Sequence, residues 1–313
     1  MPTPAQPLKI GTRGSPLALA QAYETRDRLM AAHNLPETAF EICVIKTTGD
    51  DRTMIDADIA LKTIGNKGLF TKEIEEAMIA GDIDIAVHST KDMPVEQPAG
   101  LVLDVFLPRE DVRDAFVSLK YASIADLPKG AVVGTSSLRR RAQLMAQRPD
   151  LRMVEFRGNV QTRLKKLHDG VADATFLAMA GLNRMDMTDV PAHAIAPEDM
   201  LPAIAQGTIG IEYRVNDARA ATMLVAIHDP ETGKRLAAER ALLAALDGSC
   251  ETPIGGLSII EGDQIWLRGE ILSPNGAQVF KGERRGDIED GAELGRALAE
   301  GLLAQVGPNF FSE

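Results

Sequence analysis

The sequence predicts an α/β fold of two lobes, followed by a small C-terminal α+β domain with an antiparallel sheet. Between residue 8 and about residue 227, short β-branched apolar runs end in small polar turns, and each turn opens a segment with helical periodicity. After Asp229 this alternation stops, and three alternating segments follow one another with only turn residues between them. Alternating strands and helices favour parallel or mixed sheets covered on both faces, and such lobes bind ligands beyond the carboxyl ends of their strands.

The first strand is expected at residues 9–12, and a helix follows it from Leu17 to about Ala32. Ser15 is placed to cap this helix and Pro16 to occupy its first position. The next elements are a strand at 40–46, an amphipathic helix at 69–80 and a strand at 83–88 that leads into the polar segment 89–94. Polar residues therefore follow the carboxyl ends of strands.

A second series of strands and helices begins after residues 107–111. It consists of a strand at 131–134 that enters Thr135, Ser136 and Ser137, a helix at 138–147, a basic helix at 161–168 and a strand at 174–179. The whole run is too long for one small sheet, and the proline-rich stretches 94–108 and 191–202 resemble crossovers. We therefore expect two α/β lobes.

The C-terminal part begins with a helix at 234–247 and a loop at 249–253. The alternating segments 257–261, 264–272 and 277–283 are joined by Gly262-Asp263 and Pro274-Asn275-Gly276, which are typical of hairpins. A last helix at about 289–306 would cover the resulting three-stranded antiparallel sheet.

Composition and charge exclude several classes of protein. With 34 Lys and Arg against 45 Asp and Glu, the formal net charge of −11 argues against a surface built for polyanions. Two cysteines are too few for a disulfide framework, and five dispersed histidines offer no metal-ligand spacing, so we expect no metal. No secretory signal and no apolar run of roughly 18 residues is seen, which favours the cytoplasm and no membrane association.

A dense group of cations interrupts this acidic background. Its members are Arg139, Arg140, Arg141, Arg148, Arg152, Arg157, Arg163, Lys165 and Lys166, all within 28 positions. Because hydroxyls and a helix start precede Arg139, an anion could bind there. Solvated helix faces with ion pairs are the structural alternative. Few aromatic residues accompany the arginines and no phosphate-binding loop motif is present, so a small molecule with several carboxylates is the better candidate ligand.

Two further positions could act in a reaction. His88 and Ser89 could suggest a hydrolase, but adjacent strand residues diverge and no G-x-S-x-G elbow is present. Asp92 is more useful as a carboxylate that stabilises a cation or relays a proton, with a local Asx turn as the alternative. Cys250 lies in a turn-forming loop, where its thiol could be either reactive or inert.

These residues resemble the porphobilinogen deaminase family, also called hydroxymethylbilane synthase. The matching segments are KIGTRGSPLA at 9–18, GLFTKE at 68–73, DIAVHSTKDMP at 84–94, GTSSLRR at 134–140, FRGNV at 156–160 with TR at 162–163, AGL at 180–182 with Arg184, QG at 206–207 with GIE at 210–212, and GSCETP at 248–253. The resemblance implies two lobes similar to those of type II periplasmic binding proteins and a third domain that carries a cofactor. It places domain 1 at 1–107 with 208–227, domain 2 at 108–207 and domain 3 at 228–313.

The resemblance also implies the chemistry. Four porphobilinogen molecules would be added, with loss of ammonia, to a dipyrromethane cofactor held by Cys250 through a thioether, and hydroxymethylbilane would be released. Asp92 matches the catalytic carboxylate. The positions that match cofactor-binding residues are Ser15, Lys67, Thr135, Ser136, Ser137, Arg139, Arg140, Arg163 and Arg184, and those that match substrate-binding residues are Lys9, Arg13, Arg157 and Gln206. The resemblance points to a monomer.

Two positions depart from the family pattern: Lys9 stands where many relatives have Arg, and Thr63 where some have Lys. The polar, glycine-flanked stretch 49–68 is interpreted as a lid over the ligand site. The alternative function is a two-lobed binding protein for a polycarboxylate, which would need neither Cys250 nor a third domain.

Overall fold

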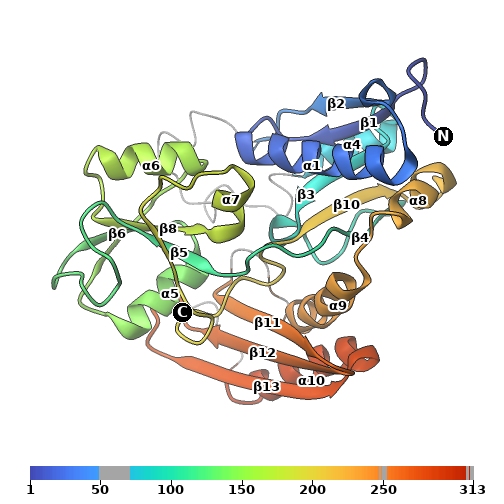
Figure 1. Cartoon of the computed structure of the whole chain (residues 1–313). Helices are drawn as coiled ribbons and strands as arrows, with labels where there is room; N and C mark the ends of the chain where they lie inside the picture. Colours follow the sequence, from blue (N-terminus) through green and yellow to red (C-terminus); the bar gives the residue numbers. More distant parts are fainter. Residues whose placement is uncertain (49–70, 247, 249–251, 308–309, 311–313) are drawn as a thin grey trace. The chain divides into compact units, whose positions relative to one another are not determined.

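The structure, a computed structural model, describes residues 1–48, 71–246, 248, 252–307 and 310. These residues form two compact units. The first unit contains residues 1–48, 71–110 and 207–233, and the second contains residues 111–206 and those described from 234 onwards. The described residues of the first unit form one sheet and those of the second unit form two (Figure 1).

The sheet of the first unit is built from two distant parts of the chain. Its strand order is β2 (Phe40–Val44), β1 (Leu8–Thr12), β3 (Ile85–Ser89), β10 (Ile209–Arg214) and β4 (Leu101–Phe106). β1 is parallel to β2 and β3, whereas β10 is antiparallel to both β3 and β4. Because β10 returns to the middle of this sheet, it contacts the segment that follows β3.

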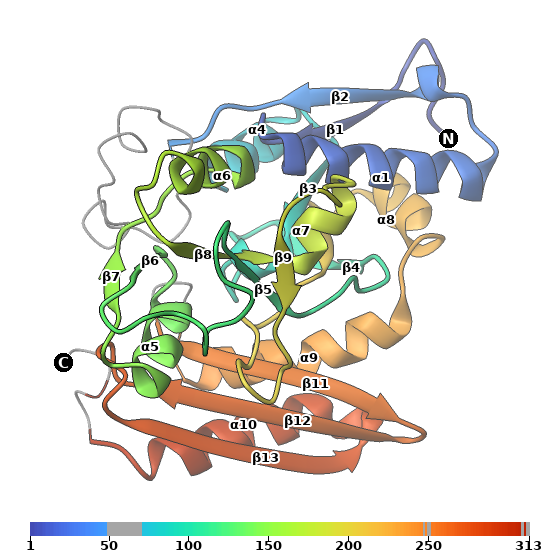
Figure 2. The same ribbon diagram turned by 60° about the vertical axis from the view of Figure 1, so that its left-hand side comes forward.

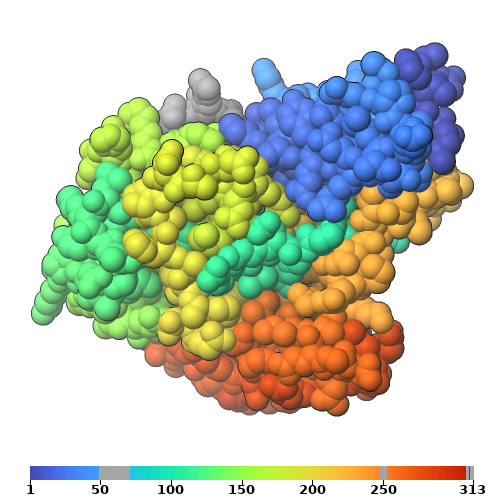
Figure 3. Space-filling model, viewed as in Figure 1, coloured from blue at the N-terminus to red at the C-terminus, as the bar shows by residue number. Residues whose placement is uncertain are grey.

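Helices cover both faces of the first sheet. On one face α1 (Pro16–His33) and α8 (Ala218–Val225) contribute Leu29 and Leu224 to a core with the strands, and on the other α4 (Lys72–Ala80) contributes Ile74 and Met78. The short 3-10 helices η1 (Glu37–Ala39) and η3 (Thr90–Asp92) follow α1 and β3. The outer side of α1 lies at the surface in Figure 3 (blue).

The second unit contains a sheet with the same plan. Its strand order is β7 (Arg152–Val154), β6 (Val132–Gly134), β8 (Ala174–Ala178), β5 (Asp114–Val117) and β9 (Ala192–Ala194). β6 is parallel to β7 and β8, and β5 is antiparallel to β8 and β9. Helix α5 (Leu138–Gln147) packs on one face, while α6 (Val160–His168) and α7 (Met179–Arg184) pack on the other.

The C-terminal part of the second unit is a three-stranded antiparallel sheet. β11 (Ile254–Glu261), β12 (Gln264–Leu272) and β13 (Val279–Asp287) pair in sequence order, as Figure 2 shows. Helices α9 (Pro230–Ala245) and α10 (Gly291–Leu303), the latter after the 3-10 helix η4 (Ile288–Asp290), pack on this sheet. Gly269 and Gly282 let Leu298 of α10 approach the strands, because a Cβ at either glycine would lie about 3 Å from its side chain.

This architecture confirms the predicted fold class: two α/β lobes and a C-terminal α+β domain with a three-stranded antiparallel sheet. The structure also contains elements that the sequence analysis did not place, among them β5, β7, β10 and α8. The stretch 94–108 contains β4, whose alternating buried residues Leu101, Leu103 and Val105 were masked by the surrounding prolines, and the stretch 191–202 contains β9. The interpretation of residues 49–68 as a lid, and the positions of Thr63, Lys67 and Cys250, lie outside the described residues.

Candidate functional site

The turn after β3 presents Asp92. Asp92 is the last residue of η3, and its exposed carboxylate has no hydrogen-bond or ion-pair partner among the described residues. The Asx turn considered from the sequence is not formed, because the residue two places on is Pro94, which has no N–H to donate. A free, exposed carboxylate at a strand end is suited to act on a bound ligand.

The backbone of this turn is fixed by the neighbouring strand and helix. The N–H of Thr90 donates to the carbonyl of Thr208 at 3.0 Å, and the N–H of Met93 donates to the carbonyl of Thr90 at 3.1 Å. The Ser89 hydroxyl lies 2.9 Å from Nε2 of Gln21 on α1. These hydrogen bonds therefore fix the backbone of the turn that carries Asp92.

His88 and Ser89 do not form a catalytic pair. Ser89 contacts Gln21 of α1, whereas Nε2 of His88 lies 3.2 Å from Oε2 of Glu212 on β10. Because α1 and the side chain of His88 belong to opposite faces of β3, neither side chain can activate the other. The hydrolase interpretation is thus not supported by the described residues.

The start of α1 holds two of the predicted binding residues. Ser15 caps the helix, its Oγ accepting from the N–H of Ala18 at 3.3 Å, and Pro16 is the first helical residue, as predicted. Arg13 is half-buried beside this cap. Lys9 lies on β1, the strand that precedes this helix, and its backbone N–H donates to Oδ2 of Asp84 at 2.9 Å.

The hydroxyls after β6 build the start of α5. Ser137 caps the helix by accepting from the N–H of Arg140 at 3.4 Å, and its own N–H donates to Oγ1 of Thr135. Oγ of Ser136 accepts from the N–H of Phe156 at 3.0 Å. All three hydroxyls predicted to bind the cofactor therefore lie together, with structural hydrogen bonds that hold the loop in shape.

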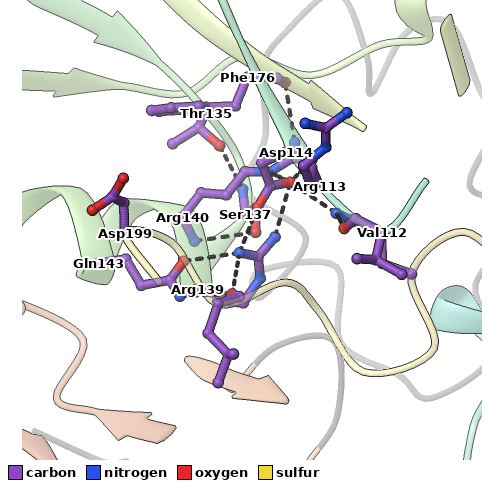
Figure 4. A network of polar contacts seen from close by, with 12 residues as sticks. Val112, Arg113, Asp114, Thr135, Ser137, Arg139, Arg140, Gln143, Phe176 and Asp199 are labelled. Atoms are coloured by element: carbon purple, nitrogen blue, oxygen red, sulfur yellow. Dashed lines mark hydrogen bonds and ion pairs between the residues drawn. The ribbon is translucent and has the colours of Figure 1, made fainter. Parts of the chain in front are cut away.

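Asp114 is the centre of a buried polar network that sequence analysis did not find (Figure 4). Its carboxylate accepts from Nη1 and Nη2 of Arg139, from Nε and Nη2 of Arg140, and from Nε2 of Gln206. Burial would raise the pKa of Asp114, but the two guanidinium groups outweigh burial and hold this pKa well below its ordinary value. Two guanidinium groups therefore share this one buried carboxylate.

The network continues from Arg139 into the C-terminal sheet. Nη1 of Arg139 also donates to Oε1 of Gln143 at 2.8 Å and to the carbonyl of Leu201 at 2.9 Å. Nε2 of Gln143 contacts Oε1 of Glu270 on β12, which is buried and also pairs with Lys281 at 3.4 Å. Helix α5 thus connects the arginines to the sheet of the C-terminal domain.

One donor in this network is unused. Among the described residues, Nε of Arg139 has no hydrogen-bond partner, although its side chain is only 5% exposed. A buried donor without a partner is costly, so a hydrogen-bond acceptor beside it would be favoured. The cluster therefore fits a ligand carboxylate.

The remaining predicted arginines follow β7 and β8. Arg157 is buried and precedes α6, which Asn159 caps by accepting from the N–H of Thr162 at 2.9 Å. Nε of Arg163 on α6 donates to the carbonyl of Gly158 at 2.9 Å. Arg184 is half-buried at the end of α7.

The structure brings Thr135, Ser136, Ser137, Arg139, Arg140 and Gln206 together in the second unit and places Lys9, Arg13, Ser15 and Asp92 in the first. Sequence analysis missed Asp114 because its partners are distant in sequence and no local motif marks it. In the described part of the chain, no group of three His, Cys, Asp or Glu residues could hold a metal ion, and no helix is long and apolar enough to cross a membrane.

Comparison with known proteins gives two consecutive family matches. Residues 8–222 match the family model described as porphobilinogen deaminase, dipyromethane cofactor binding domain. Residues 234–304 match the porphobilinogen deaminase C-terminal domain. Together these matches span nearly all of both units.

Similar proteins are found in bacteria and plants. A porphobilinogen deaminase of Paracoccus denitrificans is 63% identical, over 99% of this chain and 98% of its own. A chloroplastic porphobilinogen deaminase of Pisum sativum is 52% identical, over 97% of this chain and 83% of its own. Among solved structures, the VFT2 domain of BvgS from Bordetella pertussis is 14% identical, with a TM-score of 0.41 over 70% of this chain and 85% of that domain.

Proposed function

The chain belongs to the porphobilinogen deaminase family, and from this we propose that it joins four porphobilinogen molecules onto a dipyrromethane primer and releases hydroxymethylbilane. The observation that carries this function is the pair of family matches over residues 8–222 and 234–304, together with 63% identity to a porphobilinogen deaminase over 99% of the chain. The C-terminal match distinguishes the chain from a two-lobed binding protein, which needs no such domain.

The residues of the second unit fit a cofactor rich in carboxylates. When bound, dipyrromethane supplies the free pyrrole α-carbon that accepts the first substrate unit. The unpartnered Nε of Arg139 suits an acetate or propionate group. Thr135, Ser136, Ser137, Arg140, Arg163 and Arg184 are proposed to share this binding role, as are Ser15 and Lys67.

Asp92 is the proposed catalytic group. In each addition, the aminomethyl carbon of porphobilinogen loses ammonia and forms a bond with the free α-carbon of the terminal pyrrole. That α-carbon then loses its proton. The departure of ammonia leaves a cation on the substrate, and the exposed Asp92 carboxylate would stabilise it and hold its pyrrole N–H in place. Lys9, Arg13, Arg157 and Gln206 would bind the substrate's carboxylates and orient it. Hydrolysis of the bond between the finished tetrapyrrole and the cofactor releases hydroxymethylbilane.

We also propose Cys250 as the attachment point, the domain boundaries 1–107 with 208–227, 108–207 and 228–313, and a cytoplasmic monomer. The separate sheets of the described residues support the three-part division. The low cysteine count supports a reducing compartment.

Intact mass spectrometry tests the attachment point. We expect the wild-type protein to exceed its sequence mass of 33.7 kDa by two pyrrole units, and the Cys250→Ser variant to match its bare sequence. Cys43→Ser is the matched control, because Cys43 is the other cysteine and its thiol lies half-buried on β2. It should retain the extra mass. An unmodified wild type that stays unmodified after incubation with porphobilinogen would refute the covalent cofactor.

A further inference from the structure

His88 and Glu212 form a buried pair that the proposed reaction does not use. Nε2 of His88 lies 3.2 Å from Oε2 of Glu212, and the two side chains are 5% and 0% exposed. Among the described residues this is the only hydrogen bond of either side chain, and Oε1 of Glu212 has no partner. Burying a carboxylate with one partner is costly, so such a pair contributes little net stability.

The pair lies one strand position from the turn that carries Asp92. His88 is opposite Gly210 in the β3–β10 register, and Glu212 is opposite Ala86, so the two side chains are diagonal neighbours on one face. On its other edge, β10 has a register shift between Ile211 and Glu212. The extra residue at this shift is Asp104 of β4, so the pairing of Glu212 with Ala86 on the β3 side remains regular.

The segment from His88 to Thr90 is thus held from both faces of the sheet. On one face Glu212 holds His88, and on the other Gln21 of α1 holds Ser89. Directly beyond them, the N–H of Thr90 is bound by the carbonyl of Thr208, just before Glu212's own strand begins. The Glu212 side chain of β10 therefore contacts the end of β3, and the Thr208 carbonyl just before β10 contacts the start of the Asp92 turn.

We infer that Glu212, acting through His88, is a positioning residue that sets the direction of the turn carrying Asp92. This inference rests on the proposed role of Asp92. A small rotation of β3 at His88 would move the Asp92 carboxylate relative to the substrate, and a misplacement of about 1 Å can reduce a rate by about 100-fold. Glu212 would then affect turnover far more than cofactor loading.

The test compares substitutions of two carboxylates, Glu212 on β10 and Glu75 on α4. Glu212→Gln replaces the carboxylate that contacts His88 by an amide, while Glu75→Gln replaces a half-buried carboxylate on α4 that has no hydrogen bond to His88. We expect Glu212→Gln to lower kcat by about tenfold or more, with KM within about twofold and the cofactor mass retained. Glu75→Gln should keep the wild-type kcat.

A double variant, His88→Leu/Glu212→Leu, guards against loss of folding. Replacing both partners by apolar groups is often nearly neutral for stability, whereas removing one leaves a buried group unpaired. We expect this variant to fold, to load the cofactor and to show the same loss of kcat. If it or a folded Glu212→Gln variant retains kcat within about twofold of wild type, the positioning role is wrong. If the wild type and Glu75→Gln also fail to consume porphobilinogen, the proposed function itself is wrong.

Discussion

Both terminal nitrogens of Arg139 meet the Asp114 carboxylate: Nη1 donates to Oδ2 at 2.7 Å and Nη2 donates to Oδ1 at 3.2 Å. Arg140 approaches the same carboxylate, with Nε at 2.9 Å and Nη2 at 2.6 Å from Oδ1. A single buried anion therefore fixes two guanidinium groups. Arginines held in this way are preorganised, so an incoming carboxylate does not have to order them.

The first prediction concerns Asp114→Asn. The substitution keeps the size of the side chain but removes the anion that two buried guanidinium groups share. Breaking a buried ion pair by removing one partner costs about 3–5 kcal/mol, and we expect a loss of unfolding free energy of that order. Urea denaturation of the full chain measures it, and intact mass reports whether cofactor loading also falls.

Asp150→Asn is the matched control. Asp150 also accepts two hydrogen bonds from one arginine, Arg148, but this pair is near the surface. Solvent screens such pairs, so its loss should be much smaller than that of Asp114→Asn. Equal losses at the two positions would show that the buried network has no special contribution.

The second prediction concerns acid. The folded-state pKa of Asp114 lies below the value of about 3.9 expected for an unfolded aspartate. Its stabilising contribution is therefore fully present above about pH 5 and decreases as the pH falls below about 4, where the unfolded chain takes up the proton first. The difference in unfolding free energy between wild type and Asp114→Asn should be constant from about pH 5 to 8 and narrow at lower pH. If this difference in unfolding free energy already decreased near pH 6 or 7, the low pKa of Asp114 would not be its cause.

The sequence predicted those parts of the site that depend on neighbouring residues. Ser15 and Pro16 were expected to start the first helix, and another helix was expected to begin at Leu138; Ser15 and Ser137 cap these two helices. Both glycine-containing turns of the C-terminal sheet were also expected, and both form hairpins. Capping and turn formation need only a few consecutive residues, so their signals survive in the sequence.

Contacts between distant segments were not predictable in this way. β10 joins the first sheet from a distant part of the chain, and nothing in its own residues predicts that it pairs between β3 and β4. Asp114 belongs to β5, and its partners come from α5 and from the chain before β10. For the same reason, Arg139 and Arg140 could be identified as anion-binding candidates, but not as partners of one buried carboxylate.

The last prediction concerns Gly276, in the turn between β12 and β13. Gly276 has φ of 71°, and a Cβ there would overlap the carbonyl oxygen of Ala142 and lie 2.7 Å from the N of Ala146. These atoms are backbone of α5 and cannot move aside without distorting the helix that holds the arginines. Gly276→Ala should therefore lower the unfolding free energy by about 3 kcal/mol, which combines the cost of a left-handed alanine with that of overpacking.

Gly262→Ala isolates the backbone part of that loss. Gly262 lies in the turn between β11 and β12 with φ of 64°, but nothing lies within 4 Å of where its Cβ would be. This control should lose only the conformational cost, about 1 kcal/mol, in the same urea titration. The excess loss in Gly276→Ala then measures how closely the C-terminal hairpin is packed on α5. Equal losses in the two variants would mean that the hairpin moves away from α5 without a loss of stability. The contact between this turn and α5 would then not fix the position of the C-terminal sheet relative to Arg139 and Arg140.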